Sequence, residues 1–89
     1  MIVAFKGSFH RDASNLNDRL VKNAAREVVL RVKAASHISQ IQHLVKLRQF
    51  NVHYRIEIVG NYRIGIIIRN NKVWFVRLLH QSKIYREFP

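Results

Sequence analysis

The stretch that decides the fold is Tyr62-Arg-Ile-Gly-Ile-Ile-Ile-Arg-Asn-Asn-Lys-Val-Trp-Phe-Val-Arg-Leu-Leu-His80. Two runs rich in β-branched and aromatic residues flank Asn70-Asn71, and asparagine tolerates the positive φ that a two-residue hairpin turn requires. The pattern predicts a β-hairpin with strands over 62–69 and from 72 to 79 or 80. A similar run, Tyr54 to Ile58, precedes the hairpin, so we expect a three-stranded antiparallel meander.

The N-terminal half has helical periodicity after one short strand. Ile2 to Phe5 is an apolar run that predicts a first strand, and Ser8 is placed to cap a short helix after it. From about residue 19 to 35, apolar residues recur every four positions, and Asn17-Asp18 before them offers a break and a cap for this longer helix. Residues 36–50 show a weaker pattern, for which we expect a turn or two of helix and then an irregular segment.

Composition limits the class of protein. The 89 residues include 16 Lys and Arg against 5 Asp and Glu, a formal net charge of +11, and no Cys. This charge favours a polyanionic partner, with nucleic acid first. Without Cys the chain forms no disulfide, so we expect a cytoplasmic location, and no apolar run reaches the ~20 residues of a membrane span. We therefore expect one α+β domain over residues 1–89, a small antiparallel β-sheet with the N-terminal helices packed on one face.

The hairpin register assigns side chains to the two faces of the sheet. With Asn70-Asn71 as the turn, we expect Ile67 opposite Trp74, Gly65 opposite Val76 and Arg63 opposite Leu78. The face under the helices then carries Tyr62, Ile64, Ile66, Ile68, Val73, Phe75, Arg77 and Leu79. The open face is mixed, and on it we expect a cluster of Arg55, Glu57, Arg63 and His80.

The expected cluster contains the groups that cleave RNA without a metal. A base takes the proton from the ribose 2′-OH, an acid protonates the leaving 5′-oxygen, and a fixed cation stabilises the charge at phosphorus. Glu57, His80 and Arg63 fit these three roles, and the arrangement is similar to that of small microbial ribonucleases. The same residues also fit an ordinary solvated surface, in which Glu57 pairs with Arg55 or Arg63 across the strands.

Other polar and aromatic residues have structural interpretations as well. Trp74 fits either packing or stacking against a base. Arg77 falls on the expected core face, where we expect an ion pair at the edge, with Glu27 as a partner. The remaining histidines lack metal-ligand spacing, so we expect no metal site and no cofactor.

Most of the chain resembles the RelE branch of the RelE/ParE superfamily of toxin-antitoxin toxins. The segments that carry the resemblance are YRIEIVGNYRIGIII, KVWFVRLLH, QSKIYREFP and the opening IVAFKGSFHRDASNL. The resemblance implies a small antiparallel sheet with two N-terminal helices. It also implies a ribosome-dependent mRNA endonuclease, or mRNA interferase, that cuts message in the decoding site, inhibits translation and is silenced by an antitoxin encoded beside it.

The resemblance also implies residue roles. Arg63 matches the family's arginine that binds the scissile phosphate, and Tyr85 matches its C-terminal tyrosine that helps orient or deprotonate the nucleophile. His80 matches a histidine found in many members. Two positions depart from the pattern, because Glu57 stands where the best-studied branch has a lysine and Gln81 where relatives often have arginine. A carboxylate base at Glu57 in place of a lysine-based arrangement is a hypothesis.

We therefore predict a metal-independent endoribonuclease. Its predicted catalytic residues are Arg63, His80, Tyr85 and Glu57, and its predicted RNA-binding residues are Arg55, Arg69, Lys72, Lys83, Arg86, Lys46 and Arg48. The expected partners are mRNA, the ribosome through 16S rRNA at the A site, and an acidic antitoxin, with no membrane partner. Two other functions remain open, a toxin that poisons gyrase without nuclease residues and a basic RNA-binding module without catalysis.

Overall fold

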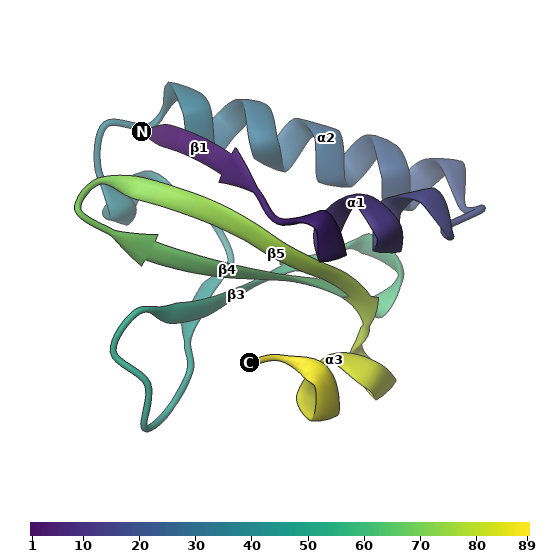
Figure 1. Ribbon diagram of the computed structural model, residues 1–89. Coiled ribbons are helices and arrows are strands. Elements are labelled where there is room, and N and C mark those ends of the chain that lie inside the picture. Colours follow the sequence, from purple (N-terminus) through teal and green to yellow (C-terminus); the bar gives the residue numbers. More distant parts are fainter.

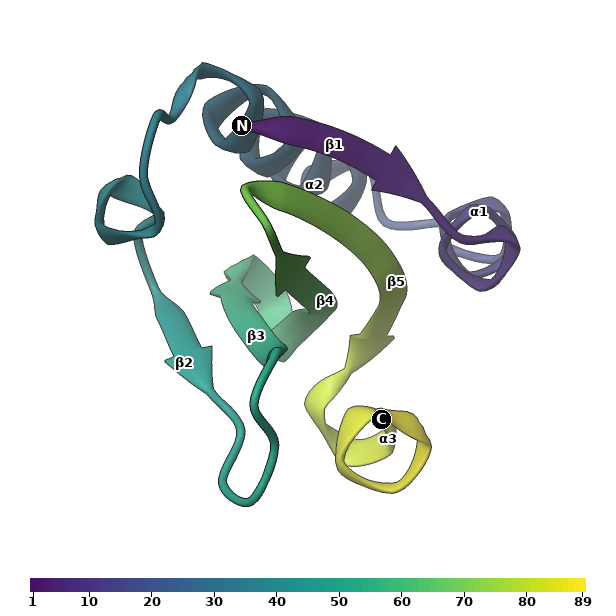
Figure 2. The same cartoon turned by 60° about the vertical axis from the view of Figure 1, so that its left-hand side comes forward.

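The strands form one sheet in the order β1-β5-β4-β3-β2 (Figures 1 and 2). The computed structural model describes residues 1–89, and its strands are β1 (Ile2–Phe5), β2 (Leu44–Lys46), β3 (His53–Ile58), β4 (Tyr62–Arg69) and β5 (Lys72–His80). The β3-β4-β5 meander is antiparallel, as predicted. β1 pairs in parallel with β5, so the sheet is mixed rather than purely antiparallel. No hairpin turn joins β1 to β5, and their relative direction is therefore not set by a local signal.

Three α-helices accompany the sheet. α1 (Gly7–Ser14) and α2 (Arg19–Ala34) precede most of the strands, α3 (Gln81–Glu87) ends the chain, and two short 3-10 turns span Ile38–Gln40 and Val59–Asn61. Asp18 caps α2 as predicted, because its Oδ1 accepts from the backbone N–H groups of Leu20 and Val21 at 2.9 and 3.3 Å. Ser8 does not cap α1; its hydroxyl donates to the carbonyl of Val76 at 2.5 Å. None of the helices is long and apolar enough to cross a membrane.

A β-bulge in β5 overturns part of the predicted register. Asn70 and Asn71 form the turn with φ of 52° and 63°, and Ile67 lies opposite Trp74 as expected. The register shifts between Gly65 and Ile66, so that Val76 is an extra residue of β5 without a partner on β4. Gly65 consequently lies opposite Arg77, and Arg63 lies opposite Leu79.

The bulge also exchanges the faces of the residues that follow it. One inserted residue reverses the alternation of a strand, so Leu78 and His80 lie on the face of α1 and α2, whereas Arg77 and Leu79 do not. Leu78 belongs to the main core, and Leu79 packs against the smaller cluster on the other face. The predicted open-face position of His80 is therefore wrong.

The N-terminal helices lie on one face of the sheet, as predicted, and α3 lies on the other. The main core joins α1 and α2 to the sheet through buried side chains that include Phe9, Val21, Ile64 and Phe75. On the opposite side, α3 packs through a second cluster of Leu47, Ile84 and Phe88 (Figures 1 and 2). Gly65 permits this packing, because a Cβ there would lie 2.7 Å from the Phe88 ring. The expected open face is thus partly covered by the C-terminal segment.

The segment over residues 36–50 contains a strand that was not predicted. Its helical part is limited to the 3-10 turn, and Leu44–Lys46 forms edge strand β2 against β3. A three-residue strand is too short to show a convincing alternation of apolar and polar residues. Leu47, directly after β2, is buried under α3, so this segment helps to hold the C-terminal helix.

Arg77 ties three elements together. Its Nε donates to Asp12 Oδ2 of α1 at 2.7 Å, its Nη2 donates to Asp12 Oδ1 at 3.1 Å, and Nη2 also lies 3.5 Å from Glu87 Oε1 of α3. Asp12 Oδ2 accepts from the backbone N–H of Leu78 as well, at 3.0 Å. The hydrogen bonds that Arg77 donates to Asp12 raise the pKa of Arg77 above its ordinary value against the opposing effect of burial, and the negative charges of Asp12 and Glu87 raise it further. The predicted ion pair of Arg77 exists, with different partners.

The fold predicts that Asp12→Ala lowers the free energy of unfolding by about 2–3 kcal/mol, because it leaves the Arg77 guanidinium largely buried without its main partner. Glu27→Gln is the matched control, since Glu27 pairs on the surface with Arg31, 3.4 Å away, and both side chains are 67% exposed. Glu27→Gln should lower the free energy of unfolding by no more than about 0.5 kcal/mol. Urea denaturation followed by circular dichroism measures both, and equal losses would contradict this account.

Candidate functional site

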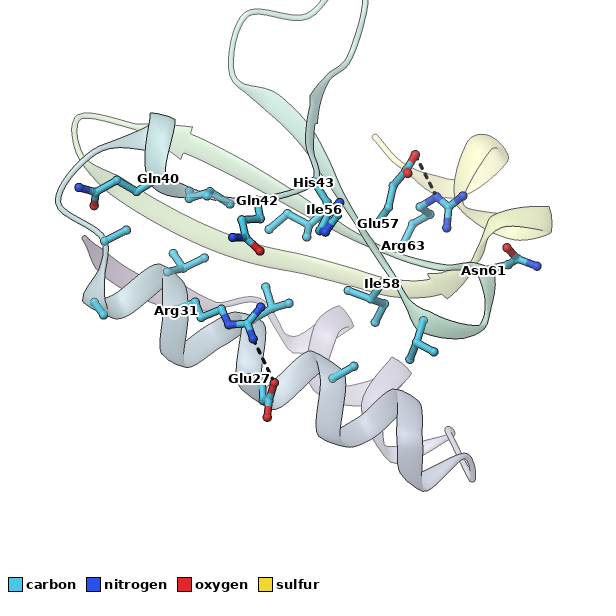
Figure 3. A pocket seen from close by; sticks show the side chains of 17 residues that line it. Glu27, Arg31, Gln40, Gln42, His43, Ile56, Glu57, Ile58, Asn61 and Arg63 are labelled. Carbon is cyan, nitrogen blue, oxygen red and sulfur yellow. Dashed lines mark hydrogen bonds and ion pairs between the residues drawn. The ribbon is translucent and has the colours of Figure 1, made fainter.

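Glu57 and Arg63 form a cross-strand pair on the face of the sheet that α3 approaches. They lie directly opposite one another on β3 and β4, with Arg63 Nε 3.7 Å from Glu57 Oε2 (Figure 3). The Arg63 side chain is only 11% exposed, whereas the Glu57 side chain is 46% exposed. The site therefore combines a held guanidinium with a carboxylate that solvent and a ligand can reach.

Hydrogen bonds fix the orientation of Arg63. Its Nη1 donates to the carbonyl of Tyr62 at 3.0 Å, and its Nη2 donates to Gln81 Oε1 at 3.2 Å. A guanidinium carries four Nη hydrogens, so two remain to meet the oxygens of a phosphate. Its Nε is buried without a hydrogen-bond partner, because the 3.7 Å approach of Glu57 is too long for a hydrogen bond.

Gln81 joins this site through its hydrogen bond with Arg63, which the sequence does not predict. The sequence shows that position 81 carries an uncharged residue. The contact of Gln81 with Arg63, however, spans 18 positions and depends on how α3 leaves β5. No local sequence pattern predicts such a contact. Gln81 orients the guanidinium rather than adding to its charge.

α3 brings Tyr85 to the same face. The Arg55 guanidinium carbon lies 4.7 Å from the centroid of the Tyr85 ring, and Tyr85 is 58% exposed. Arg55 lies opposite Gly65, two pairs along the sheet from Glu57 and Arg63 and therefore on the same face. The predicted residues Arg55, Glu57, Arg63 and Tyr85 thus share one face, with two guanidinium groups, a carboxylate and a phenol.

His80 lies apart from that group. Its ring packs edge-on against Tyr62 with centroids 5.4 Å apart, on the other face of the sheet. Its Nδ1 accepts from the backbone N–H of Ser82 at 3.2 Å and thereby caps α3. The neutral ring then carries its proton on Nε2. His80 makes no hydrogen bond or ion pair with Glu57, Arg63 or Tyr85.

The predicted RNA-binding residues other than Arg55 fall in three places. Lys83 and Arg86 are exposed on α3, and Lys46 and Arg48 are exposed at the end of β2, where Lys46 Nζ donates to the carbonyl of Phe50 at 2.6 Å. Arg69 and Lys72 face one another beside the hairpin turn. The first two groups lie on elements that adjoin the cluster of Leu47, Ile84 and Phe88, and the third lies at the far end of the sheet.

A groove of about 720 Å³ runs from this site along the sheet edge (Figure 3). Its walls are α2, the segment before β2, and β3, and it is lined mainly by apolar side chains. Glu57 and Arg63 line it together with Glu27 and Arg31 of α2. The groove therefore links the charged pair to an apolar channel between helix and sheet.

The side chains on this face can bind a phosphate and transfer a proton. Arg63 and Arg55 provide fixed positive charge, and Glu57 and Tyr85 provide groups that accept or donate a proton. No group of three or more His, Cys, Asp or Glu side chains able to hold a metal ion occurs in the structure.

Comparisons with known proteins agree with the fold. No model of a known protein family matches the chain. Its sequence is 29% identical to Toxin RelE3 of Methanocaldococcus jannaschii over 90 residues, which cover 100% of both chains. The structure superposes on a chain of the RelB-RelE antitoxin-toxin complex from Methanococcus jannaschii with a TM-score of 0.77 and 26% identity, covering 96% of this chain and 98% of that one.

A more distant structure shows the same architecture. A chain of the intact E. coli RelBE toxin-antitoxin complex superposes with a TM-score of 0.69 at 16% identity, covering 89% of this chain and 94% of that one. At this identity the similarity concerns the fold alone. The chain is thus similar to RelE toxins both in sequence, over its full length, and in its α+β fold.

Proposed function

We propose that this toxin acts in a type II toxin-antitoxin system and inhibits translation by cleaving mRNA on the ribosome. The observation that carries the proposal is the Arg63 guanidinium, oriented by Tyr62 and Gln81 and placed beside the exposed carboxylate of Glu57. A cation held in advance stabilises charge that develops at phosphorus without having to reorganise during the reaction. The net charge of +11 supports an RNA substrate.

In the proposed reaction, Glu57 takes the proton of the ribose 2′-OH as the oxygen attacks the adjacent phosphorus. The bond from phosphorus to the 5′-oxygen breaks, which leaves a 2′,3′-cyclic phosphate on one fragment and a 5′-hydroxyl on the other. Arg63 stabilises the charged phosphoryl group, and Arg55 holds the strand. Tyr85 lies beside Arg55 and helps to orient the nucleophile. The proton for the leaving oxygen comes from Tyr85, because His80 lies on the other face of the sheet.

The partner that silences this activity is proposed to be an acidic antitoxin. An acidic, partly disordered chain with an amphipathic helix complements a surface of this charge, either across the Arg63 face or in place of the segment from Lys83 to Pro89. The second site is supported by the way α3 is held, since a cluster of only three buried residues, Leu47, Ile84 and Phe88, packs α3 against the sheet. Displacing α3 would also remove Gln81 from Arg63.

Arg63→Ala should lower message cleavage by about 10²–10³-fold, the typical loss when a preorganised group that stabilises the transition state is removed. Arg19→Ala is the matched control, since it removes the same charge from an exposed position at the start of α2. Cleavage is measured on ribosomes translating a defined message, and thermal unfolding shows that both variants are folded. Wild-type cleavage by folded Arg63→Ala protein would remove Arg63 from the site.

The pH–rate profile separates the roles of Glu57 and His80. If Glu57 is the base, activity rises with pH as its carboxyl loses a proton, and Glu57→Gln should abolish that limb. His80→Asn keeps an N-cap for α3 but no imidazole, whereas His80→Ala removes both. Loss of the falling limb in both His80 variants would assign the acid to the imidazole. Normal rates in His80→Asn together with impaired His80→Ala would show that His80 acts by capping.

The activity of a Glu57→Lys variant tests whether Glu57 takes part in the mechanism. Glu57→Lys restores the residue type found in the best-studied relatives. Equal or higher activity in this variant would show that the carboxylate is incidental and that a lysine-type arrangement is competent. A loss comparable to that of Glu57→Gln is the expected outcome.

Salt separates the two proposed partners. RNA affinity should fall by about 0.7 log unit per log unit of salt for each phosphate neutralised on a single strand. The antitoxin complex should lose less, because its helix also buries apolar surface, which salt does not screen. Titrations of both complexes from low to high salt test this. Equal sensitivity would indicate purely electrostatic inhibition and would rule out helix docking.

A further inference from the structure

A second basic surface lies on the same face of the sheet as Arg63, at the end nearest the hairpin turn. β4 carries Arg69 and Ile67 toward this end, where they lie opposite Lys72 and Trp74 of β5. β1 adds Ile2 opposite Lys72, and Lys6 follows directly after β1. We call these residues the Trp74 surface: Ile2, Lys6, Ile67, Arg69, Lys72 and Trp74. Phe88 of the C-terminal segment covers Gly65 between this surface and Arg63.

Two ammonium groups lie against the Trp74 ring. Lys72 Nζ is 4.2 Å from the ring centroid, and Lys6 Nζ is 4.5 Å from it. The attraction of each cation for the electron-rich ring holds both amines near one place despite their mutual repulsion. The result is a half-buried aromatic ring with positive charge collected around it.

No carboxylate neutralises these cations. Each of the chain's acidic side chains is engaged elsewhere, in these contacts: Asp12 and Glu87 with Arg77, Asp18 at the start of α2, Glu27 with Arg31, and Glu57 with Arg63. Lys6, Arg69 and Lys72 appear in no ion pair. The positive charge of this surface is therefore not neutralised within the chain, which favours binding of an anionic partner.

We propose that the Trp74 surface binds single-stranded RNA, with Lys6, Arg69 and Lys72 on phosphates and the Trp74 ring against an unpaired base. A ring flanked by cations matches a strand in which bases alternate with phosphates, which is how sequence-tolerant single-strand sites are built. The proposal rests on the proposed function in that the RNA is the message or the ribosomal RNA beside it. The surface positions RNA and takes no part in breaking the bond.

The lysines do not obstruct the ring. Each cation is held over the half-buried ring by a weak attraction, and each amine sits on a flexible stem. An arriving phosphate offers the same amine a charge-assisted hydrogen bond, so the amines move to the backbone as the base meets the ring. The ring therefore keeps the two ammonium groups close to the positions that the phosphates of a bound strand would occupy.

The experiment uses Trp74 as its own reporter, since it is the chain's single tryptophan. The probe is a short, end-labelled 2′-O-methyl oligouridylate, which cannot be cleaved because its 2′-oxygen is blocked. Trp74 emission should change along the same saturation curve as the anisotropy of the label. Trp74→Leu should weaken binding about 10-fold, the usual order for losing one base–aromatic stack.

Charge variants complete the test. The double variant Lys6→Gln/Lys72→Gln should reduce the slope of log K against log salt concentration by about 1.4 in magnitude, because each lysine neutralises one phosphate. The control Lys22→Gln/Lys33→Gln removes the same charge from exposed positions on α2 and should leave the slope nearly unchanged. Unchanged Trp74 emission at saturation, or equal effects of both double variants, would overturn the proposal. So would a polyglutamate peptide that competes as well as the RNA, since the partner would then be an acidic protein.

The outcome is separable from that of the proposed function. Oligonucleotide binding at Trp74 without any message cleavage would leave this surface standing and reject the nuclease. Message cleavage that depends on Arg63, with no response of Trp74 to the oligonucleotide, would reject this surface and leave the nuclease standing.

Discussion

The unpaired Val76 in β5 is the constraint on which the functional face depends. Because of the bulge, the Leu78 side chain lies in the main core, and Arg77 lies where it forms ion pairs with Asp12 of α1 and Glu87 of α3. It also determines the direction in which the chain leaves β5, so that α3 folds back across the sheet over Gly65. From there Gln81 reaches Arg63 and Tyr85 reaches Arg55. Without this extra residue the contact of α3 with Arg63 would not form.

Local signals account for the part of the fold that the sequence predicts correctly. Asn70-Asn71 specifies its own turn geometry, and Asp18 specifies the start of α2, because each acts on backbone groups within a few residues. The face assignment along β4 follows from that turn by strict alternation, and the alternation along β3 places Glu57 on the face of Arg63. These predictions hold up to the bulge, and the misplacement of His80 begins there.

Non-local contacts account for the rest. The parallel pairing of β1, the edge strand β2 and the docking of α3 are decided by packing between distant segments, which leaves little trace in periodicity. The bulge belongs to this group too, since the Val76 carbonyl accepts from Ser8, 68 positions away. The candidate site is therefore predicted in its β3 and β4 residues and only partly in those from β5 and α3. Its positive character was evident from composition, because the few acidic side chains cannot neutralise the many cations.

The central claim is that the Arg63 face cleaves message, and the most direct measurement is a map of new RNA 5′ ends in cells that express the chain. The account predicts cuts confined to translated regions of messages, bearing 5′-hydroxyl ends, and absent when the expressed chain carries Arg63→Ala at equal abundance. Growth arrest with no new RNA ends but with gyrase-dependent DNA breaks would contradict the account, because it would assign this fold to a toxin that acts without nuclease chemistry.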